Sequence, residues 1–413
     1  MSPPACHGCG AALPAPFLSL GAMPPANAYL RAEDLDRPEP RYPLDVRYCP
    51  ACHLVQVDPL VAPAELFGDY AYFSSYSTSW VEHARRFAAD ATARLGLGPA
   101  SRVVEIASND GYLLRHFVAS GIPALGIEPA ANVAAAAVAS GVPTEVRFFG
   151  REAAEDLVAR GLAADLVVAN NVLAHVPDLH DFAAGLARLV KPTGRISIEF
   201  PHLLNLVADT QFDTIYHEHF SYFSLLALLP VLAGHGLTAL EVERLPTHGG
   251  SLRLWLAPGR GEAGSVDRAA TVEDVLAAER AAGLDRAATY AAFAERVAHC
   301  RESLRAFLAT ARAEGRTVVA YGAAAKGNTL LNHCGIGPAE IAFVVDRNPV
   351  KQGRFLPGSR IPIRDPGAIA TARPDYLLIL PWNLAEEIVG QMDEIRGWGG
   401  RFVVPVPETR LLP

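Results

Sequence analysis

Two pairs of cysteines near the N-terminus constrain the fold of this chain most strongly. The stretches "CHGC" and "CPAC" contain Cys6, Cys9, Cys49 and Cys52 in two knuckles of identical spacing. Two residues between paired thiolates let both sulfurs reach one tetrahedral ion, and two pairs supply four ligands. Four thiolates leave no position for water, so we expect a structural zinc site. A redox-active or chance pairing of the cysteines is the alternative.

Residues 1–75 are predicted to form a small module around this ion, because they are rich in proline and short of helical periodicity. His7 and His53, inside and beside the knuckles, could replace a thiolate as ligand. Cys300 and Cys334 are isolated and are expected to be ordinary packed or surface residues. The N-terminus has no basic segment followed by an apolar block, and no apolar run is long enough to span a membrane, so the sequence predicts a cytoplasmic protein, in which thiols stay reduced.

Composition limits the class of partner. The chain has 413 residues, half of them hydrophobic, which is enough for two or three domains. Its net charge of −8 argues against nucleic acid as the main partner, since a phosphodiester-binding face usually has a basic excess. No apolar run reaches membrane-spanning length, so no membrane is expected. The oligomeric state is not determined by the sequence.

The middle of the chain, residues 76–260, is predicted to be a doubly wound α/β domain. "RVVEI" and "ALGIEP" are typical of buried parallel strands, and "YLLRHFVAS" between them has helical spacing. The first strand ends near Glu105 and the second at Glu128, which could accept hydrogen bonds from ribose hydroxyls. The G-x-G-x-x-G pattern of dinucleotide domains is absent, because only Gly111 lies in the loop. An α/β sheet with ordinary polar loops is the alternative.

The same sheet is predicted to end in a hairpin formed by "GLTALEVERLP" and "GGSLRLWLAP". Its turn, "THGGS", contains two glycines that permit positive φ or close approach of a ligand. We therefore count His248, Ser251 and Arg253 as candidate substrate ligands. An ordinary hairpin turn is equally compatible with this pattern.

Residues 261–413 are predicted to form a second α/β domain after a helical lead-in. "TVVAYG", "IAFVVD" and "DYLLILP" are strand patterns, and "AAAKGN" is a loop that precedes a helix. Gly322, Lys326 and Asn328 could hold the diphosphate of a sugar nucleotide there. Lys326 is one of only three lysines in the chain. The P-loop pattern is absent, so no phosphotransfer is inferred; a structural repeat of the middle domain is the alternative.

The stretch "IYHEHFSYFS" contains two histidines, a glutamate and two tyrosines within ten residues. A zinc protease needs H-E-x-x-H on a helix, and Ser221 stands where the second histidine would be, so that class is excluded. A metal site formed by His217 and His219 has no obvious third ligand. A hydrogen-bonded polar cluster in an aromatic core is as compatible with the residues alone as a catalytic group.

Taken in order, these motifs resemble the S-adenosylmethionine-dependent sugar C-methyltransferases over nearly the whole chain. The resemblance rests on "CHGC…CPAC", "YAYFSSYSTSW", "EIASNDGYLL", "GIEPAANV", "NNVLAHVPDL", "YHEHFSYFS", "HGGSLR" and "YGAAAKGNTLLN". Known members act on dTDP-linked 4-keto-deoxysugars, usually at carbon 3, in antibiotic biosynthesis. The chain departs from the family at Ala107, where glycine is common. The resemblance therefore implies an α/β enzyme with a zinc module, a methyltransferase domain and a C-terminal Rossmann-like domain.

The resemblance also assigns roles to individual residues. His219 falls at the expected base, with Tyr216 and Glu218 beside it. The four cysteines correspond to zinc ligands, and Tyr72 or Tyr76 could reach the site from the boundary of the zinc module. His175 is a further active-site candidate. The implied cofactor site comprises Glu105, Ala107, Asn109, Asp110, Gly111, Glu128, Pro129, Asn132, Asn170 and Asn171.

Methylation of a carbon next to a ketone requires a base that is neutral near pH 7 and a donor for the developing oxyanion. Histidine suits the first role, and a tyrosine hydroxyl or second histidine the second. Glu218 could orient an imidazole, but in an extended segment it would share a side with Tyr216 and not with His219. Two other hypotheses stay open: a nicotinamide-dependent sugar oxidoreductase and a zinc-containing adaptor without activity.

Overall fold

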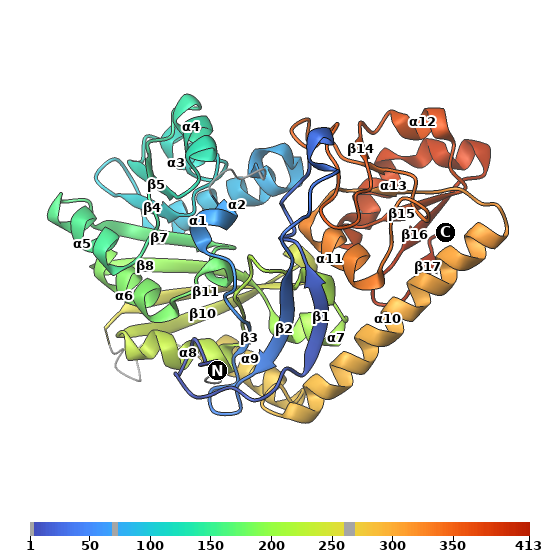
Figure 1. Cartoon of the computed structure of the whole chain (residues 1–413). Coiled ribbons are helices and arrows are strands. Elements are labelled where there is room, and N and C mark those ends of the chain that lie inside the picture. Colours follow the sequence, from blue (N-terminus) through green and yellow to red (C-terminus); the bar gives the residue numbers. More distant parts are fainter. Residues whose placement is uncertain (1–3, 68–72, 260–268) are drawn as a thin grey trace.

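The computed structural model describes residues 4–67, 73–259 and 269–413 and contains three β-sheets (Figure 1). These sheets, together with the helices that pack on them, confirm the α/β class. No helix within the described ranges is both long and apolar enough to cross a membrane.

The N-terminal part is a small antiparallel sheet of order β1-β2-β3-β9. Its last strand is contributed by the middle of the chain, because Tyr222 pairs with Val55 and Ser221 with Gln56. The zinc module is thereby joined to the segment that contains the paired histidines. The strands are β1 (Leu18–Met23), β2 (Tyr42–Tyr48), β3 (Val55–Val57) and β9 (Ser221–Tyr222), and the short helix α1 (Pro63–Phe67) follows β3.

The middle part is a seven-stranded sheet of order β10-β11-β8-β7-β4-β5-β6. Strands β4 to β8 are parallel, and the predicted hairpin β10–β11 adds two antiparallel strands beside β8. The hairpin therefore belongs to the middle domain, as expected. The strands are β4 (Val103–Ile106), β5 (Ala124–Glu128), β6 (Thr144–Val146), β7 (Ala164–Asn170), β8 (Val190–Pro201), β10 (Leu237–Leu245) and β11 (Ser251–Pro258).

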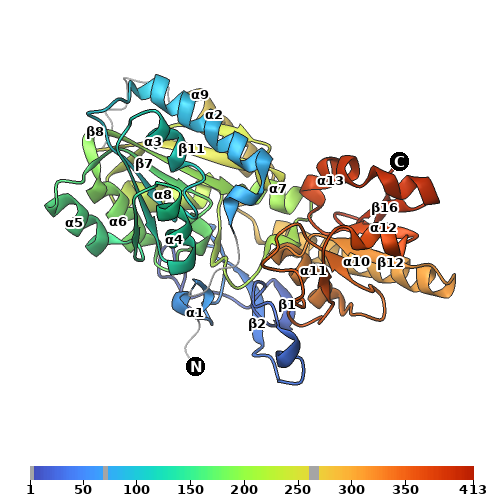
Figure 2. The ribbon, with the colours of Figure 1, turned by 90° about the horizontal axis from the view of Figure 1, so that it is seen from above.

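Helices cover both faces of this sheet (Figure 2). Alternate residues of β4 point to opposite faces, so Val104 joins one buried cluster with Phe182, while Val103 joins another with Phe117 and Trp255. The helices that follow α1 in this part of the chain are α2 (Thr78–Leu95), α3 (Leu114–Ala119), α4 (Ala131–Ala139), α5 (Arg151–Ala159), α6 (Leu179–Leu189), α7 (Leu203–Ala208), α8 (Leu225–Gly234) and α9 (Ala269–Ala281). Of these, α7 packs its buried residues into the core cluster of the zinc module and the C-terminal domain.

The C-terminal part is a six-stranded sheet of order β14-β13-β12-β15-β16-β17, parallel except for its last strand. The 27-residue helix α10 leads into it and runs along its outer side (Figure 1). The elements are α10 (Ala287–Ala313), β12 (Val318–Tyr321), α11 (Ala325–Cys334), β13 (Val344–Val345), β14 (Ile363–Arg364), α12 (Ala368–Ala372), β15 (Tyr376–Ile379), α13 (Ala385–Gln391), β16 (Arg401–Val404) and β17 (Arg410–Leu411).

Candidate active site

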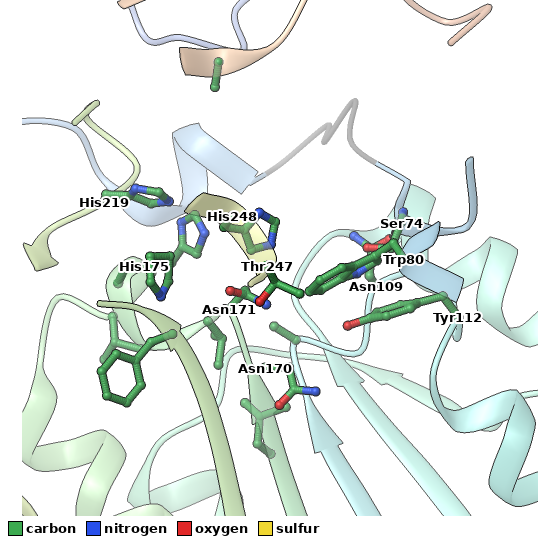
Figure 3. A pocket seen from close by; sticks show the side chains of 18 of the residues that line it. Ser74, Trp80, Asn109, Tyr112, Asn170, Asn171, His175, His219, Thr247 and His248 are labelled. Carbon is green, nitrogen blue, oxygen red and sulfur yellow. Dashed lines mark hydrogen bonds between the residues drawn. The ribbon is translucent and has the colours of Figure 1, made fainter. Parts of the chain in front are cut away.

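A cavity of about 1400 Å³ lies at the carboxyl end of the middle sheet and is lined by all three parts of the chain. The N-terminal part contributes Asn27, and the C-terminal domain contributes Lys326 and Lys351. Figure 3 shows two groups of side chains on opposite sides of the cavity. One group is His175 and His219; the other is Trp80, Asn109 and Tyr112, with Asn171 between the two groups.

The loop after β4 forms one edge of the cavity. Ala107, Asn109 and Gly111 all have positive φ, at 53°, 50° and 76°, so the backbone curls tightly after the strand. The carboxylate of Glu128, at the end of β5, accepts hydrogen bonds from Asn109 N at 2.9 Å and Ala130 N at 2.8 Å. Burial raises the pKa of Glu128, while these two backbone donors act in the opposite direction.

Asn170 and Asn171 at the end of β7 also line this edge. Asn170 Oδ1 and both amide atoms of Asn171 are buried without a hydrogen-bond partner among the described residues. Buried amide groups are rarely left unsatisfied, so these atoms are available to a polar ligand. With Glu128 they provide acceptors and donors for ribose and amino-acid groups, and the residues present therefore fit S-adenosylmethionine.

Several predicted cofactor residues support the loop and do not face the cavity. Glu105 is 1% exposed, and burial together with the charges of Glu128 and Asp110 raises its pKa well above the ordinary value. Asp110 accepts a hydrogen bond from Ser75 N at 3.1 Å, which ties the start of the middle domain to the loop. Gly111 and Asn132 are likewise absent from the cavity wall, whereas Ala107, Asn109 and Pro129 belong to it.

His219 and His175 form a pair on the opposite side of the cavity, with ring centroids 4.7 Å apart. His219 Nδ1 lies 2.9 Å from Thr214 O, and His175 Nδ1 lies 2.8 Å from Glu218 O. A carbonyl oxygen can only accept, so each Nδ1 carries the proton and each Nε2 retains a lone pair. Burial lowers the pKa of His175 to about 4 and that of His219 well below its usual range. Both imidazoles are therefore neutral near pH 7.

The segment around His219 is a turn and not an extended strand. His219 N donates to Tyr216 O at 2.9 Å, and the ring of Tyr216 lies 4.0 Å from that of His219 between centroids. The Glu218 carboxylate accepts hydrogen bonds from Asn27 Nδ2 at 2.8 Å. The side chain of Glu218 is thus hydrogen-bonded to the zinc module, and its backbone carbonyl is hydrogen-bonded to His175. The alternation expected for an extended segment is not observed, because the backbone reverses here.

His217 is directed away from the cavity. Its Nε2 lies 3.1 Å from Tyr42 O and 3.3 Å from Pro43 O, and its ring packs against Tyr42. His217 and His219 therefore do not combine in a metal site. In the described part of the chain, the one group of side chains able to hold a metal ion is the cysteine cluster.

The hairpin turn contributes a second wall of the cavity. His248 has φ 55° and lies 4.8 Å from the ring of Trp80 between centroids. Gly250, with φ 110°, is packed so closely that a Cβ there would lie 1.6 Å from Asn205 Nδ2. The side chain of Asn205, and not a ligand, thus occupies the space beside this glycine. Ser251 is buried and donates to Thr247 O at 2.9 Å, so it does not reach the cavity.

Arg253 lines the cavity but is already engaged in a buried network. Its Nη2 donates to Glu199 Oε2 at 2.8 Å, and His83 Nε2 lies 2.9 Å from the same oxygen. Burial alone would raise the pKa of Glu199, but the hydrogen bonds and charges of His83 and Arg253 outweigh it and lower the pKa. The sequence analysis missed His83, Glu199 and Trp80. The spacing of Trp80, His83 and Phe87 along one face of α2 was the available signal.

The three residues predicted as a diphosphate clamp are not brought together. Lys326 lines the cavity. Asn328 is 1% exposed and donates to Ala26 O at 2.6 Å, inside the contact with the zinc module. A Cβ on Gly322 would lie 2.5 Å from Pro381, so this glycine serves chain packing. Tyr76 is 48% exposed and absent from the cavity wall, and Tyr72 lies outside the described residues.

The four N-terminal cysteines form a compact cluster. All four Sγ atoms lie within 4.8 Å of one another, with Cys6 and Cys52 3.4 Å apart and Cys9 and Cys49 3.6 Å apart. Zn–S bonds of about 2.3 Å in a tetrahedron require similar separations, so the thiolates fit zinc. Four protein ligands fill the coordination sphere, and the cluster is absent from the wall of the large cavity. The zinc site is therefore structural.

The parallel sheet, the terminal hairpin and the polar groups at its carboxyl end define a methyltransferase domain joined to a zinc module. Family models agree: residues 6–67 match a "Putative zinc binding domain", 80–242 a "Methyltransferase domain" and 246–407 a "C-methyltransferase C-terminal domain". The chain is 39% identical over 407 residues to C-methyltransferase NovU of Streptomyces niveus, covering 98% of this chain and 96% of that protein. The chain belongs to this family of S-adenosylmethionine-dependent C-methyltransferases.

Solved structures resemble part of the chain. Magnesium protoporphyrin IX methyltransferase of Synechocystis PCC 6803, with bound SAM, has 15% identity and a TM-score of 0.34, covering 44% of this chain and 82% of that one. An S-adenosylmethionine-dependent methyltransferase of Clostridium acetobutylicum has 9% identity and a TM-score of 0.34, covering 44% of this chain and 92% of that one.

Proposed function

We propose that this enzyme methylates a carbon next to the ketone of a nucleotide-linked 4-keto-deoxysugar, with dTDP as the nucleotide and carbon 3 as the preferred position. The observation that carries the proposal is the pair of neutral imidazoles, His219 and His175, facing the cofactor edge across one cavity. A neutral imidazole that carries its lone pair on Nε2 can remove a proton from a carbon acidified by a ketone.

In the proposed reaction His219 Nε2 takes the proton, and the electrons of the C–H bond move into an enolate. Thr214 O holds Nδ1–H of His219, which fixes the tautomer and steadies the imidazolium that forms. The hydroxyl of Tyr216 is the group near the base that could donate to the ketone oxygen, and the ring of His175 could help to position the sugar. When bound, S-adenosylmethionine supplies the electrophilic methyl group.

Glu218 acts on this site mainly through its backbone. Its carbonyl holds His175, and its carboxylate is bonded to Asn27 of the zinc module. We therefore assign Glu218 a positioning role. The thiolate zinc site is consistent with a reducing cytoplasm. The resemblance to sugar C-methyltransferases supports a role in deoxysugar biosynthesis for antibiotics.

The test is methyl transfer by His219→Asn, with His217→Asn as a matched control from the same turn. With dTDP-4-keto-6-deoxyglucose as the probe, we expect His219→Asn to lose about 10²–10⁴-fold in kcat, as for removal of a general base. S-adenosylhomocysteine should still raise its melting temperature. His217→Asn should keep its turnover, because its imidazole faces the zinc module. Normal turnover in folded His219→Asn would rule out the assigned base.

The pH dependence gives an independent check. Because burial depresses the pKa of both histidines, the base becomes protonated only below its ordinary range, and activity is lost as pH falls through that lowered value. Wild-type kcat/KM should therefore stay level from pH 8 to about pH 6.5, the ordinary pKa of histidine. A fall centred near pH 7 would contradict a buried neutral base.

A further inference from the structure

Lysine is scarce in this chain, and its placement is uneven. Of Lys191, Lys326 and Lys351, only Lys191 lies away from the cavity, where it pairs with Asp165 at 2.7 Å. The other two belong to the C-terminal domain and line the cavity opposite the methyltransferase sheet. The C-terminal domain thus contributes both lysines that face the proposed reaction space.

The two cavity lysines differ in how their charge is balanced. Lys351 Nζ donates to Ala323 O at 2.7 Å and lies 3.9 Å from Asp346 Oδ2. Lys326 Nζ donates to the neutral amide oxygen of Asn383 at 2.6 Å and lies 4.6 Å from the centre of the Trp382 ring. Among the described residues, no carboxylate oxygen lies within 4.0 Å of Lys326 Nζ.

Asp213 is the acid whose charge acts on Lys326, but its carboxylate is hydrogen-bonded to another side chain. Asp213 Oδ2 accepts a hydrogen bond from Trp382 Nε1 at 2.8 Å. Burial lowers the pKa of Lys326, and the charge of Asp213 opposes this by favouring the ammonium form. A partly buried ammonium with only a neutral amide and an aromatic face as near neighbours is suited to an additional anion.

The charge of Lys326 acts on the side of the cavity where the base lies. Burial is the largest cause of the lowered pKa of His219 and of His248, and the positive charge of Lys326 is a further cause in both cases. The same field that disfavours an imidazolium favours a negative charge on a neighbouring oxygen. An enolate formed by proton transfer to His219 develops such a charge in this part of the cavity.

We propose that Lys326 stabilises the enolate oxygen, so that the C-terminal domain supplies an electrostatic catalyst to the methyltransferase domain. This inference rests on the proposed function. In the first step the proton moves to His219, the C–H pair forms a C=C bond and the carbonyl π pair moves to oxygen beside the ammonium. In the second, the enolate carbon bonds the methyl group as its C–S bond breaks, the ketone re-forms, and His219 returns its proton to solvent.

The diphosphate of a sugar nucleotide is the other anion that Lys326 could meet, and the test separates the two. Wild type, Lys326→Met, Lys326→Arg and the surface control Lys191→Met are compared with dTDP-4-keto-6-deoxyglucose. Deuterium uptake next to the ketone is followed by NMR in D₂O with S-adenosylhomocysteine, which reports deprotonation without methyl transfer. Binding of dTDP alone and of S-adenosylhomocysteine is measured by calorimetry.

We expect Lys326→Met to lose about 10²–10³-fold in both deuterium uptake and kcat, as when one oxyanion donor is removed. Its affinities for dTDP and S-adenosylhomocysteine should stay within about twofold of wild type, since neither carries the enolate. Lys326→Arg should retain more uptake than Lys326→Met, because the charge is kept. Lys191→Met should match wild type in every measurement.

Uptake at the wild-type rate in Lys326→Met would overturn the inference, and so would a tenfold or greater loss of dTDP affinity. If Lys326→Met does not fold, as judged by its melting curve, Lys326→Gln replaces it in the same measurements. A wild-type protein that neither methylates the probe nor exchanges its protons would reject the proposed function first, and the inference with it. Normal wild-type turnover with an unaffected Lys326→Met rejects the inference alone.

Discussion

The middle and C-terminal sheets begin with the same local arrangement. In each, a strand is followed by a tight loop and a helix, and an acid at the end of the next parallel strand accepts a hydrogen bond from that loop. Glu128 Oε2 accepts from Asn109 N at 2.9 Å, and Asp346 Oδ2 accepts from Ala323 N at 2.8 Å. Both sheet edges therefore have the acid-and-loop geometry that Rossmann-like folds use for nucleotides.

The two edges differ in what lies against the loop. Both edges contribute residues to the cavity wall, but the acid of the middle edge, Glu128, lies in that wall, whereas Asp346 of the C-terminal edge does not. At the C-terminal edge, Tyr29 of the zinc module donates to Ala323 O at 2.6 Å, and Lys351 lies 5.1 Å from the centre of its ring. We call these the open edge and the filled edge. The local motif therefore does not decide whether a nucleotide site is available, because a distant segment can pack against the same loop.

Removal of zinc should have the largest effect on the difference between the two edges. The zinc module supplies the residues at the filled edge, and structural zinc contributes on the order of 10 kcal/mol to small modules. Chelation should therefore raise amide hydrogen exchange around Ala323 and Asn328, while β4 and β5 keep their protection. Unchanged exchange at the filled edge after complete loss of zinc, measured by mass spectrometry, would contradict this.

Tyr29→Ala should be the next most disruptive change. Tyr29 is 8% exposed, and truncating a large buried aromatic side chain costs about 3–5 kcal/mol of unfolding free energy. Denaturant unfolding measures the loss, and Tyr29→Phe should cost only about 1 kcal/mol, for one hydrogen bond. Affinity for S-adenosylhomocysteine should be unchanged, since the open edge is intact. A large loss of that affinity would show that the edges are coupled.

The acids at the two edges offer a matched pair. Glu128→Gln should weaken S-adenosylhomocysteine binding by about 10–100-fold, because hydrogen bonds to a charged group contribute about 1.5–3 kcal/mol. Asp346→Asn should leave that affinity within about twofold and lower only stability. Calorimetric titration of both variants measures the difference. Equal effects of the two substitutions would remove the distinction between open and filled edges.

Ala107→Gly should have the smallest effect. Ala107 has φ 53°, a conformation that costs an L-residue about 1–2 kcal/mol, while glycine costs about 0.5–1 kcal/mol in chain entropy. The unfolding free energy should rise by less than about 1 kcal/mol. A loss of stability in thermal or denaturant unfolding would show that the methyl group packs usefully.

Much of the fold followed from short-range pattern. The spacing of Cys6, Cys9, Cys49 and Cys52 indicated the zinc cluster, and the strand, loop and helix patterns located both parallel sheets and the hairpin. These features depend on residues close in sequence, whose relative positions are restricted by backbone geometry and hydrophobic periodicity. The catalytic role of His219 came from a family resemblance and remains a prediction.

The tertiary structure alone decided which side chains share the cavity. His217 and His219 are two residues apart, yet a turn sends one to the zinc module and the other to the cavity. Lys326 and Asn328 also differ, because residues two positions apart on α11 point to different sides of the helix: Lys326 lines the cavity, and Asn328 donates to Ala26 O. Side-chain direction in turns depends on how the three parts pack, and so do contacts such as those of Asn328 with Ala26 and of Arg360 with Leu35, which join distant segments of the chain. Local sequence patterns were therefore enough to predict the separate sheets and the cysteine cluster, whereas the packing of the three parts determines which side chains line the site.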